Sequence, residues 1–335
     1  MRRRFLVLLA GIVLLAGTAL LLVRGGEEAG FRVQGTELLA PDGEPFVIRG
    51  VVMPYGTFAG GPGAGAAETN FRELTADLRR VRHAGGNLIR VFVDPKTLGA
   101  GGFDRLDRVV AEARGQGFVV QLSGAFATAQ AARPLVRQLA EHFNGDPWVW
   151  LQPMNEPQCT TAEDKALGHC GDWGRWQADH RAYLNIIRAA GVTSPVVVNT
   201  PNFSTDLREL DRHPLDDDQV LFGVHRYGNE RASFTGDERR LVEAQIGEPS
   251  RRHPTFVDEV GNFNGPQFPN AIAWSDGMTR WAAGWIARGD GLGATGFNWR
   301  WSDANTMIDG AGKPTPWGTV FTRNILRPGA GSVAR

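Results

Sequence analysis

The stretch WVWLQPMNEP, residues 148–157, decides how the rest of this chain is interpreted. It opens with four apolar residues, and Pro153 follows them after a single glutamine. Because proline cannot donate to a β-sheet ladder, a buried strand ends there and a loop begins. Asn155 and Glu156 therefore lie where a rigid strand passes into a loop. A glutamate in this place is either a polar strand end without chemistry or a catalytic group, and the rest of the chain decides between the two.

Seven other apolar runs have the same strand-like character, and segments with helical spacing of apolar residues separate them. The runs are Phe46–Met53, Asn87–Asp94, Phe118–Leu122, Pro195–Asn199, Gln219–Gly228, Thr255–Gly261 and Gly293–Ser302. Eight strands that alternate with helices predict an α/β fold, namely a (β/α)8 or TIM barrel. The 335 residues leave room for one barrel of about 250 residues, and no internal repeat or second domain is evident. Ahead of the barrel, Phe31 to Gly50 is expected to form a β-hairpin with Asp42-Gly43 as its turn.

Residues 1–24 are predicted to form a signal anchor. Three arginines precede an uncharged apolar run, residues 5–23, which as a helix is about 28 Å long and matches the hydrocarbon thickness of a membrane. This length favours an uncleaved anchor over a cleavable signal peptide, for which Gly17-x-Ala19 offers a weak cleavage site. The arginines would stay inside, so that a linker at 25–30 and the barrel domain at 31–335 lie outside the cytoplasm, anchored or secreted.

Composition and charge exclude several functions. The formal net charge is zero, which gives no reason to expect nucleic-acid binding. The seven histidines show no HExxH cluster and the glycine-rich loop after Tyr55 has no phosphate-binding spacing, so we expect no metal and no other cofactor. Cys159 and Cys170 lie close together without metal-ligand spacing, and outside the cytoplasm we expect them to form a disulfide. The chain is expected to be a monomer.

Polar residues mark the ends of several predicted strands, and catalytic groups of β/α barrels come from the C-terminal ends of the strands. Arg90 lies inside the second strand, where a buried charge needs a partner. His225 and Tyr227 alternate onto one face at the end of the sixth strand, and Glu259 lies near the end of the seventh. A structural salt bridge for Arg90 and a core pair for His225 and Tyr227 are the alternatives.

The eighth predicted strand carries three aromatic residues on one face: Phe297, Trp299 and Trp301. An indole at a barrel mouth can pack against the apolar face of a sugar ring. The alternative is that both indoles are buried between the barrel and its helices.

Taken together and in their order along the chain, these motifs resemble those of glycoside hydrolase family 5, the retaining β-glycosidases that include cellulases and mannanases. Asn155-Glu156-Pro157 resembles the acid/base motif of that family, and Glu259, two residues before Gly261, resembles its nucleophile motif. The hairpin with its Arg49-Gly50 end also resembles the start of many family 5 catalytic domains.

The resemblance also implies substrate-binding roles. Arg90, preceded by Gly86-Asn87, matches an arginine that contacts the nucleophile, and Tyr227 in His225-x-Tyr227 matches a tyrosine whose hydroxyl does the same. Trp299 aligns better than Trp301 with the tryptophan that stacks on the sugar being cleaved. One departure is Ser123-Gly124-Ala125, where many members carry a histidine.

The implied reaction is double displacement on a β-linked polysaccharide or oligosaccharide. Glu259 attacks the anomeric carbon, Glu156 protonates the leaving oxygen and then deprotonates water, and Asn155 binds the sugar 2-hydroxyl. Endo-β-1,4-glucanase activity, as in cellulases, is the first expectation, with β-mannan and β-1,3-glucan as alternative substrates. Two other classes stay open: a catalytically silent barrel that binds glycans at the cell surface, and an unrelated metal-dependent barrel hydrolase.

Overall fold

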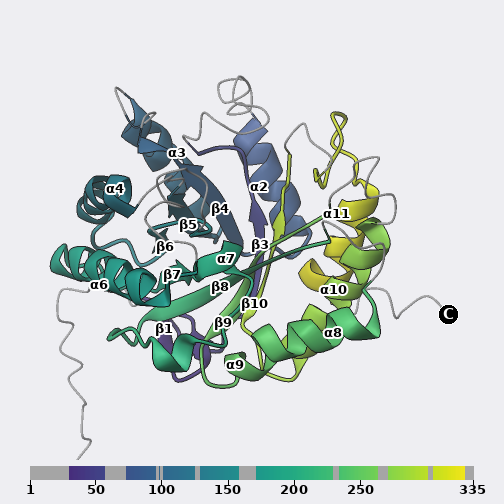
Figure 1. Cartoon of the computed structure of the whole chain (residues 1–335). Helices are drawn as coiled ribbons and strands as arrows, with labels where there is room; N and C mark the ends of the chain where they lie inside the picture. Colours follow the sequence, from purple (N-terminus) through teal and green to yellow (C-terminus); the bar gives the residue numbers. More distant parts are fainter. Residues whose placement is uncertain are drawn as a thin grey trace, which may run out of the picture.

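The computed structural model (Figure 1) describes residues 30–56, 73–95, 98, 101–124, 129–157, 171–228, 234–262, 271–300 and 305–328. The predicted anchor, both cysteines of the predicted disulfide and Trp301 lie outside these residues. Within the described ranges, no helix is both long and apolar enough to cross a membrane.

Eight parallel strands close into a barrel in the order β10-β3-β4-β5-β6-β7-β8-β9. Their bounds are β3 (Ile48–Val52), β4 (Leu88–Val93), β5 (Val119–Gly124), β6 (Val149–Gln152), β7 (Val196–Asn199), β8 (Val220–Tyr227), β9 (Thr255–Gly261) and β10 (Gly293–Phe297). Parallel strands that are covered on both faces bury nearly every side chain, which explains their almost continuous apolar sequences. The predicted (β/α)8 barrel is confirmed.

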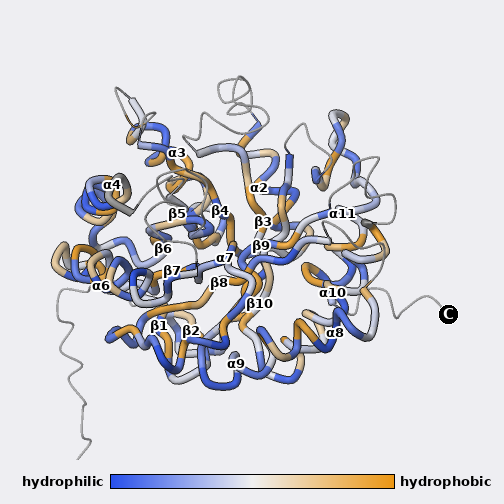
Figure 2. The backbone as a smooth tube through the Cα atoms, viewed as in Figure 1, coloured by the Kyte–Doolittle hydropathy of each residue, from blue (hydrophilic) through white to orange (hydrophobic). Residues whose placement is uncertain are grey.

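Helices surround the barrel (Figure 1). They are α2 (Leu74–His83), α3 (Gly102–Arg114), α4 (Ala129–His142), α6 (Trp173–Ala189), α7 (Pro201–Ser204), η4 (Leu210–Arg212), α8 (Gly236–Val242), η5 (Glu243–Gly247), α9 (Glu248–Ser250), α10 (Ala271–Ala287), α11 (Pro316–Phe321) and η6 (Thr322–Leu326). Thr235 caps α8 by accepting a hydrogen bond from the amide of Glu238, as its Thr-x-x-Glu sequence predicts. Apolar residues concentrate where strands and helices meet (Figure 2), which buries one stripe of each helix.

The N-terminal hairpin is present, but its turn is not the predicted one. β1 (Arg32–Gln34) pairs with the antiparallel β2 (Glu37–Leu39), and Gly35 with Thr36 forms the two-residue turn between them. Gly35 has φ +64°, a left-handed conformation that glycine adopts without steric cost, and this makes the tight turn possible. The Asp42-Gly43 signal instead marks a second turn that closes the bridge between Leu39 and Pro45.

The barrel interior has an apolar layer at the N-terminal ends of its strands. The layer contains Ile48, Leu88, Val119, Trp150, Val197, Leu221, Phe256 and Leu292. Phe31, next to the hairpin, packs edge-on against Trp150 with ring centroids 5.3 Å apart and against Trp148 at 5.0 Å. The hairpin region therefore plugs this end of the barrel.

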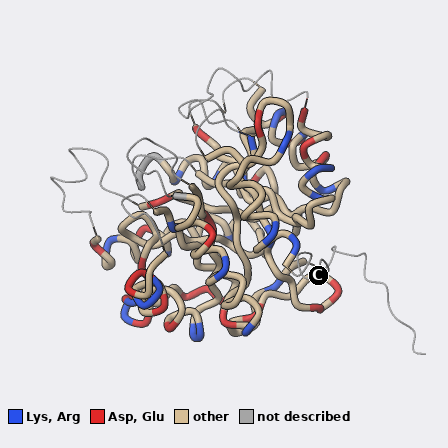
Figure 3. Tube along the Cα trace, turned by 90° about the vertical axis from the view of Figure 1, so that its right-hand side faces the viewer, with Lys and Arg blue, Asp and Glu red and all other residues tan. Residues whose placement is uncertain are grey.

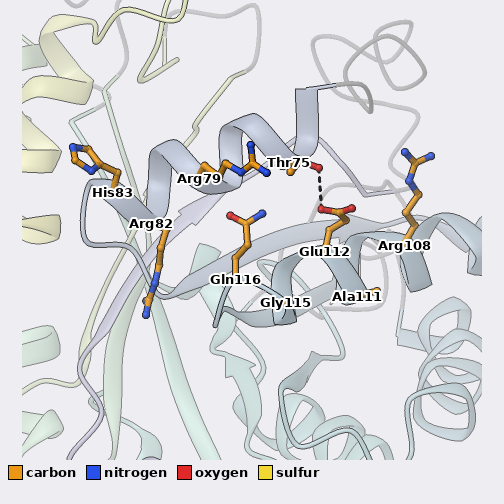
Figure 4. A pocket seen from close by; sticks show the side chains of 9 residues that line it. All are labelled: Thr75, Arg79, Arg82, His83, Arg108, Ala111, Glu112, Gly115 and Gln116. Carbon is orange, nitrogen blue, oxygen red and sulfur yellow. Dashed lines mark hydrogen bonds between the residues drawn. The ribbon is translucent and has the colours of Figure 1, made fainter.

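Charged residues lie mostly on the outside, where acidic and basic groups are interspersed in the view of Figure 3. An open groove of about 830 Å³ lies between α2 and α3, and Figure 4 shows the side chains that line it. Within it, the hydroxyl of Thr75 donates to Glu112 at 2.9 Å, and Arg79 and Arg82 come from α2. None of the residues that the sequence analysis singled out as catalytic or substrate-binding lines this groove.

Candidate active site

The predicted site residues come together at the C-terminal end of the barrel. Arg90 comes from β4, Glu156 from the loop after β6, His225 and Tyr227 from β8, and Glu259 from β9. Side-chain hydrogen bonds or ion pairs connect all five. Residues far apart in the chain meet here because all strands of a parallel barrel end at the same rim.

Arg90 is the central cation of the site. Its side chain is fully buried, and it donates through Nη1 to Glu259 and through Nη2 to Asn155 and, at 3.1 Å, to Ser123. Its Nε donates to Gln152 at 3.0 Å. Burial opposes the charge of Arg90, but the adjacent carboxylates raise its pKa above the ordinary value. The predicted contact between this arginine and Glu259 is confirmed.

Glu259 is held by two donors. The guanidinium of Arg90 binds Oε2, and the hydroxyl of Tyr227 donates to Oε1, as predicted from the His-x-Tyr motif. Burial and the negative charge of Glu259 raise the pKa of Tyr227 well above its ordinary value, so this hydroxyl keeps its proton. Both carboxylate oxygens of Glu259 are therefore held in place by donors.

Glu156 has a different environment. Its side chain is one-fifth exposed, whereas that of Glu259 is 7% exposed. The backbone of Glu156 has φ +42°, which is a strained conformation for a non-glycine residue and typical of functional sites. Its amide donates to Asn199 at 3.3 Å, and its Oε1 lies 2.7 Å from Nδ1 of His225.

His225 lies between carboxylates. It is 1% exposed, and burial alone would lower its pKa. The charge of Glu259 and the hydrogen bonds with Asp258 and Glu156 outweigh that effect and raise the pKa of His225 to about 10. Both ring nitrogens of His225 therefore lie beside carboxylate oxygens, Nδ1 at Glu156 and Nε2 at Asp258.

A buried polar layer beneath the site was missed in the sequence analysis. It consists of Gln121 on β5, Gln152 on β6, Asn199 on β7 and Asp258 on β9. Gln152 donates to Asn199 at 2.6 Å and to Asp258 at 2.7 Å. The signal that could have found these residues is the one that singled out Arg90, a polar residue inside an apolar strand.

The eighth strand does not present its tryptophan as expected. Trp299 is 5% exposed and belongs to the main apolar cluster, which matches the alternative of an indole packed between barrel and helices. Trp301 lies outside the described residues. Phe297, at the end of β10, is half-buried, and its ring packs edge-on against Tyr227 with centroids 6.1 Å apart.

Ser123 lies at the end of the third barrel strand, where many family members carry a histidine. This serine is fully buried and accepts a hydrogen bond from Arg90, so it helps to hold the guanidinium in place. Glu156, His225 and Glu259 also bring one potential ligand atom each within 4.8 Å of one another. This spacing follows from the short contacts of Nδ1 of His225 with Glu156 at 2.7 Å and with Glu259 at 3.8 Å.

A parallel barrel with two neighbouring carboxylates at its C-terminal rim is an arrangement that glycoside hydrolases use. The family model for cellulases, glycosyl hydrolase family 5, matches residues 41–305, and the chain belongs to this family.

Relatives agree with this assignment, and solved structures share the fold. A mannan endo-1,4-β-mannosidase of Cellvibrio japonicus is 22% identical over 96% of this chain and 72% of its own length. Endoglucanase N of Pectobacterium atrosepticum is 23% identical, over 59% of this chain and 43% of its own length, so the match spans less than half of that protein. A β-glucanase structure from Saccharophagus degradans has a TM-score of 0.73 at 17% identity and covers 88% of this chain and 92% of its own. A β-mannanase from Thermomonospora fusca reaches 0.64 at 19% identity, over 89% and 96%.

Proposed function

We propose that this protein is a retaining β-glycoside hydrolase that cleaves a β-linked polysaccharide by double displacement. The observation that carries the proposal is the spacing of the two carboxylates, since an oxygen of Glu156 lies within 4.8 Å of an oxygen of Glu259. Retaining enzymes hold their carboxyl groups about 5 to 5.5 Å apart, whereas inverting enzymes leave about 6.5 to 9.5 Å for a water molecule.

The two glutamates take different roles because their surroundings differ. Glu259, which is bound by Arg90 and Tyr227, attacks the anomeric carbon. Glu156 is more exposed and lies beside the place where the leaving group departs, so it protonates the glycosidic oxygen. In the second step Glu156 takes a proton from water, which then releases the sugar from Glu259.

Asn155 and Phe297 complete the binding of the reacting sugar in this proposal. The side-chain oxygen of Asn155 is oriented by Arg90, which leaves its amide group to donate to the sugar 2-hydroxyl. Phe297, rather than the buried Trp299, offers a partly exposed aromatic face near Tyr227. Aromatic faces pack well against the C–H face of a pyranose ring.

β-1,4-Glucan is the substrate that we propose first. The S. degradans β-glucanase and Endoglucanase N support a glucan substrate, and the former has also been solved in complex with cellotetraose. β-Mannan is the second candidate, because the relative that matches 96% of this chain is a mannan endo-1,4-β-mannosidase.

A panel of oligosaccharides tests the proposal. Cello-, manno- and β-1,3-gluco-oligosaccharides are incubated with the enzyme, with and without a chelator, and the first product anomer is followed by proton NMR. We expect chelator-insensitive cleavage with the β-anomer formed first. An α-anomer as first product would overturn retention, loss of activity with chelator would favour a metal-dependent hydrolase, and binding without cleavage would favour a silent glycan-binding barrel.

We also propose that the enzyme acts outside the cytoplasm, held by the apolar run at residues 5–23 or released from it. Fractionation of cells that express the full chain, followed by alkaline washing of the membranes, tests this. Activity confined to the cytosolic fraction would contradict it.

A further inference from the structure

Asp258 is a fully buried carboxylate next to the proposed nucleophile, and four polar side chains surround it in addition to Arg90. Gln121 donates to its Oδ1 at 2.8 Å, and Gln152 donates to its Oδ2 at 2.7 Å. Asn199 Nδ2 and His225 Nε2 each lie 3.3 Å from the same Oδ2. Because Asp258 has no exposed surface, it cannot touch a substrate, and any part it plays in the reaction acts through these neighbours.

A β-bulge explains why two consecutive residues of β9 both point into the barrel. Val257 is opposite Val224 on β8, but Glu259 is opposite the next residue, His225, so Asp258 is the extra residue. Such a bulge lets the strand present both Asp258 and Glu259 to the same side. The site consequently contains one more acidic group than the two catalytic glutamates.

The charges of the site require a second cation. Arg90 lies 3.6 Å from Asp258 and also binds Glu259, so one guanidinium serves two carboxylates. His225 is the group that reaches every acid: its Nδ1 is 2.7 Å from Glu156 and 3.8 Å from Glu259, and its Nε2 is 3.3 Å from Asp258. The charged and titratable groups around His225 are Glu156 after β6, Asp258 and Glu259 on β9, Arg90 on β4 behind those carboxylates, and Tyr227 on its own strand.

We propose that Asp258 is a positioning residue that keeps His225 doubly protonated, so that Nδ1–H donates to Oε1 of Glu156 and the acid proton of Glu156 lies on Oε2. The inference rests on the proposed acid/base role of Glu156. A neutral His225 could accept a hydrogen bond from the carboxylic acid at Nδ1, which would hold the proton away from the glycosidic oxygen. Asp258 thus determines which oxygen of Glu156 delivers the proton, although it never meets the substrate.

Burial and the surrounding charges support this arrangement. Burial opposes ionisation of Asp258, but the charge of Arg90 and the hydrogen bond with His225 hold the pKa of Asp258 far below its ordinary value. An ionised Asp258 at 3.3 Å stabilises the protonated form of the imidazole.

The first experiment is independent of catalysis. The full-length protein is labelled with nitrogen-15 in its histidines, and His225 is assigned by comparison with His225→Asn. We expect both ring nitrogens of His225 to carry a proton at pH 8 in the wild type. In Asp258→Asn, we expect the midpoint of deprotonation to fall to about neutral pH or below, so that His225 is neutral where the enzyme works. A neutral His225 at pH 8 in the wild type, or an unchanged midpoint in the variant, would overturn the proposal.

The second experiment measures the role in acid catalysis. With phenyl β-cellobioside, whose leaving group needs a proton, Asp258→Asn should lower kcat/KM about 100-fold and shift the alkaline limb of the pH profile downward. With dinitrophenyl β-cellobioside, whose leaving group needs little protonation, the loss should stay below about fivefold. Equal losses with both substrates would mean that Asp258 acts on Glu259 through Arg90, and the proposal would be wrong.

A double variant and a folding control complete the design. If Asp258 acts through His225, the pair Asp258→Asn and His225→Asn should be no slower on phenyl β-cellobioside than His225→Asn alone. Additive losses would contradict the proposal. If Asp258→Asn does not fold, the wild-type NMR experiment decides by itself. If the wild type cleaves no β-glycoside, the proposed function fails, whereas the NMR result still tests the contact between Asp258 and His225.

Discussion

The two ends of the barrel interior use the same strands for opposite purposes. On five strands, an apolar residue near the N-terminal end is followed two positions later by a polar one: Leu88 and Arg90, Val119 and Gln121, Trp150 and Gln152, Val197 and Asn199, Phe256 and Asp258. Both layers are buried. Dispersion stabilises the lower, apolar layer at the N-terminal ends of the strands, whereas hydrogen bonds and ion pairs stabilise the upper, polar layer at their C-terminal ends. On each of these strands, the residue that stabilises the barrel and the residue that belongs to the site are therefore only two positions apart.

Two buried histidines also differ from each other because their surroundings differ. His225 is 1% exposed and His180, on α6, is 2% exposed. Burial lowers the pKa of His180 to about 4, and its hydrogen bond with the carbonyl of Trp176 at 2.8 Å and the charge of Asp179 oppose that effect without reversing it. The carboxylates around His225 reverse the effect of the same burial and raise its pKa to about 10. Burial does not set the charge of a histidine, since the neighbouring charges decide its sign.

The largest expected effect comes from replacing the two proposed catalytic glutamates at the C-terminal rim of the barrel. Glu259→Gln should lower kcat by about 10⁴-fold or more, because the nucleophile is lost. Glu156→Gln should lower it about 10² to 10⁴-fold on substrates with poor leaving groups. Steady-state kinetics on oligosaccharides and on aryl β-glycosides measure both.

Folding provides the control for these variants. Asp258 stays 3.6 Å from Arg90 when Glu259 is replaced, so the arginine keeps a partner and urea melts should show a folded protein. Azide should rescue the alanine variants with the retained anomer at one position and the inverted anomer at the other. If both glutamine variants keep near-normal turnover, the assignment of the catalytic pair is wrong.

A change in the lower, apolar layer should instead reduce stability and leave turnover nearly unchanged. Trp150→Ala should reduce the free energy of unfolding by about 3 to 5 kcal/mol, because it leaves a cavity beneath Phe31, while kcat of the folded fraction stays near normal. Trp150→Phe is the matched control: the indole N–H has no hydrogen-bond partner among the residues that the structure describes, so the smaller ring should cost less than the alanine variant. Urea melts and kinetics at a temperature well below Tm check both. A large loss of kcat in Trp150→Ala would show that the two layers are not independent.

The pH dependence of stability should separate the two histidines. His225 has a raised pKa, so its stabilisation is complete below the unfolded value of about 6.5 and is lost as the pH rises toward about 10. His180 has a lowered pKa, so its neutral form stabilises above about 6.5 and that contribution is lost as the pH falls toward about 4. Each limb should amount to about 1 to 3 kcal/mol of unfolding free energy.

Urea melts from pH 4 to pH 10 test this against the variants His225→Asn and His180→Asn. The difference between wild type and His225→Asn should shrink with rising pH, and that between wild type and His180→Asn should shrink with falling pH. The same slope for both differences would mean that the surrounding charges do not distinguish the two sites.

The smallest expected effect concerns the mouth of the barrel. Phe297→Ala should lower kcat/KM about tenfold and change Tm little, because a half-buried ring that packs against the ligand contributes more to binding than to folding. Trp299→Ala is the contrasting variant and should lose stability as Trp150→Ala does, with kinetics near normal in the folded fraction. If Trp299→Ala instead impairs only kcat/KM, its predicted role as the sugar platform is restored and Phe297 loses it.

Much of the site could be predicted because its residues lie at strand ends that the sequence marks clearly. Arg90 attracts notice as a charge inside an apolar run, and Glu156 stands next to a proline that ends its strand. The buried amides of Gln121, Gln152 and Asn199 were harder to interpret, because an amide in a strand has no charge that demands a partner. Trp299 was misjudged because strand alternation ended at Phe297, and beyond that point a period of two no longer determines which side chains face the mouth.

The sequence by itself determined the barrel, the family motifs and the order of the catalytic groups, because strand-forming runs, prolines and periodicity are local properties of the chain. The tertiary structure decided which side chains of β9 face the interior. A strict period of two from Phe256 would place Asp258 inside and turn Glu259 outward, but pairing with β8 inserts a bulge at Asp258 and brings Glu259 opposite His225. Register depends on the neighbouring strands, and the charge of His225 depends on carboxylates from two other segments, so neither can be deduced from the local sequence.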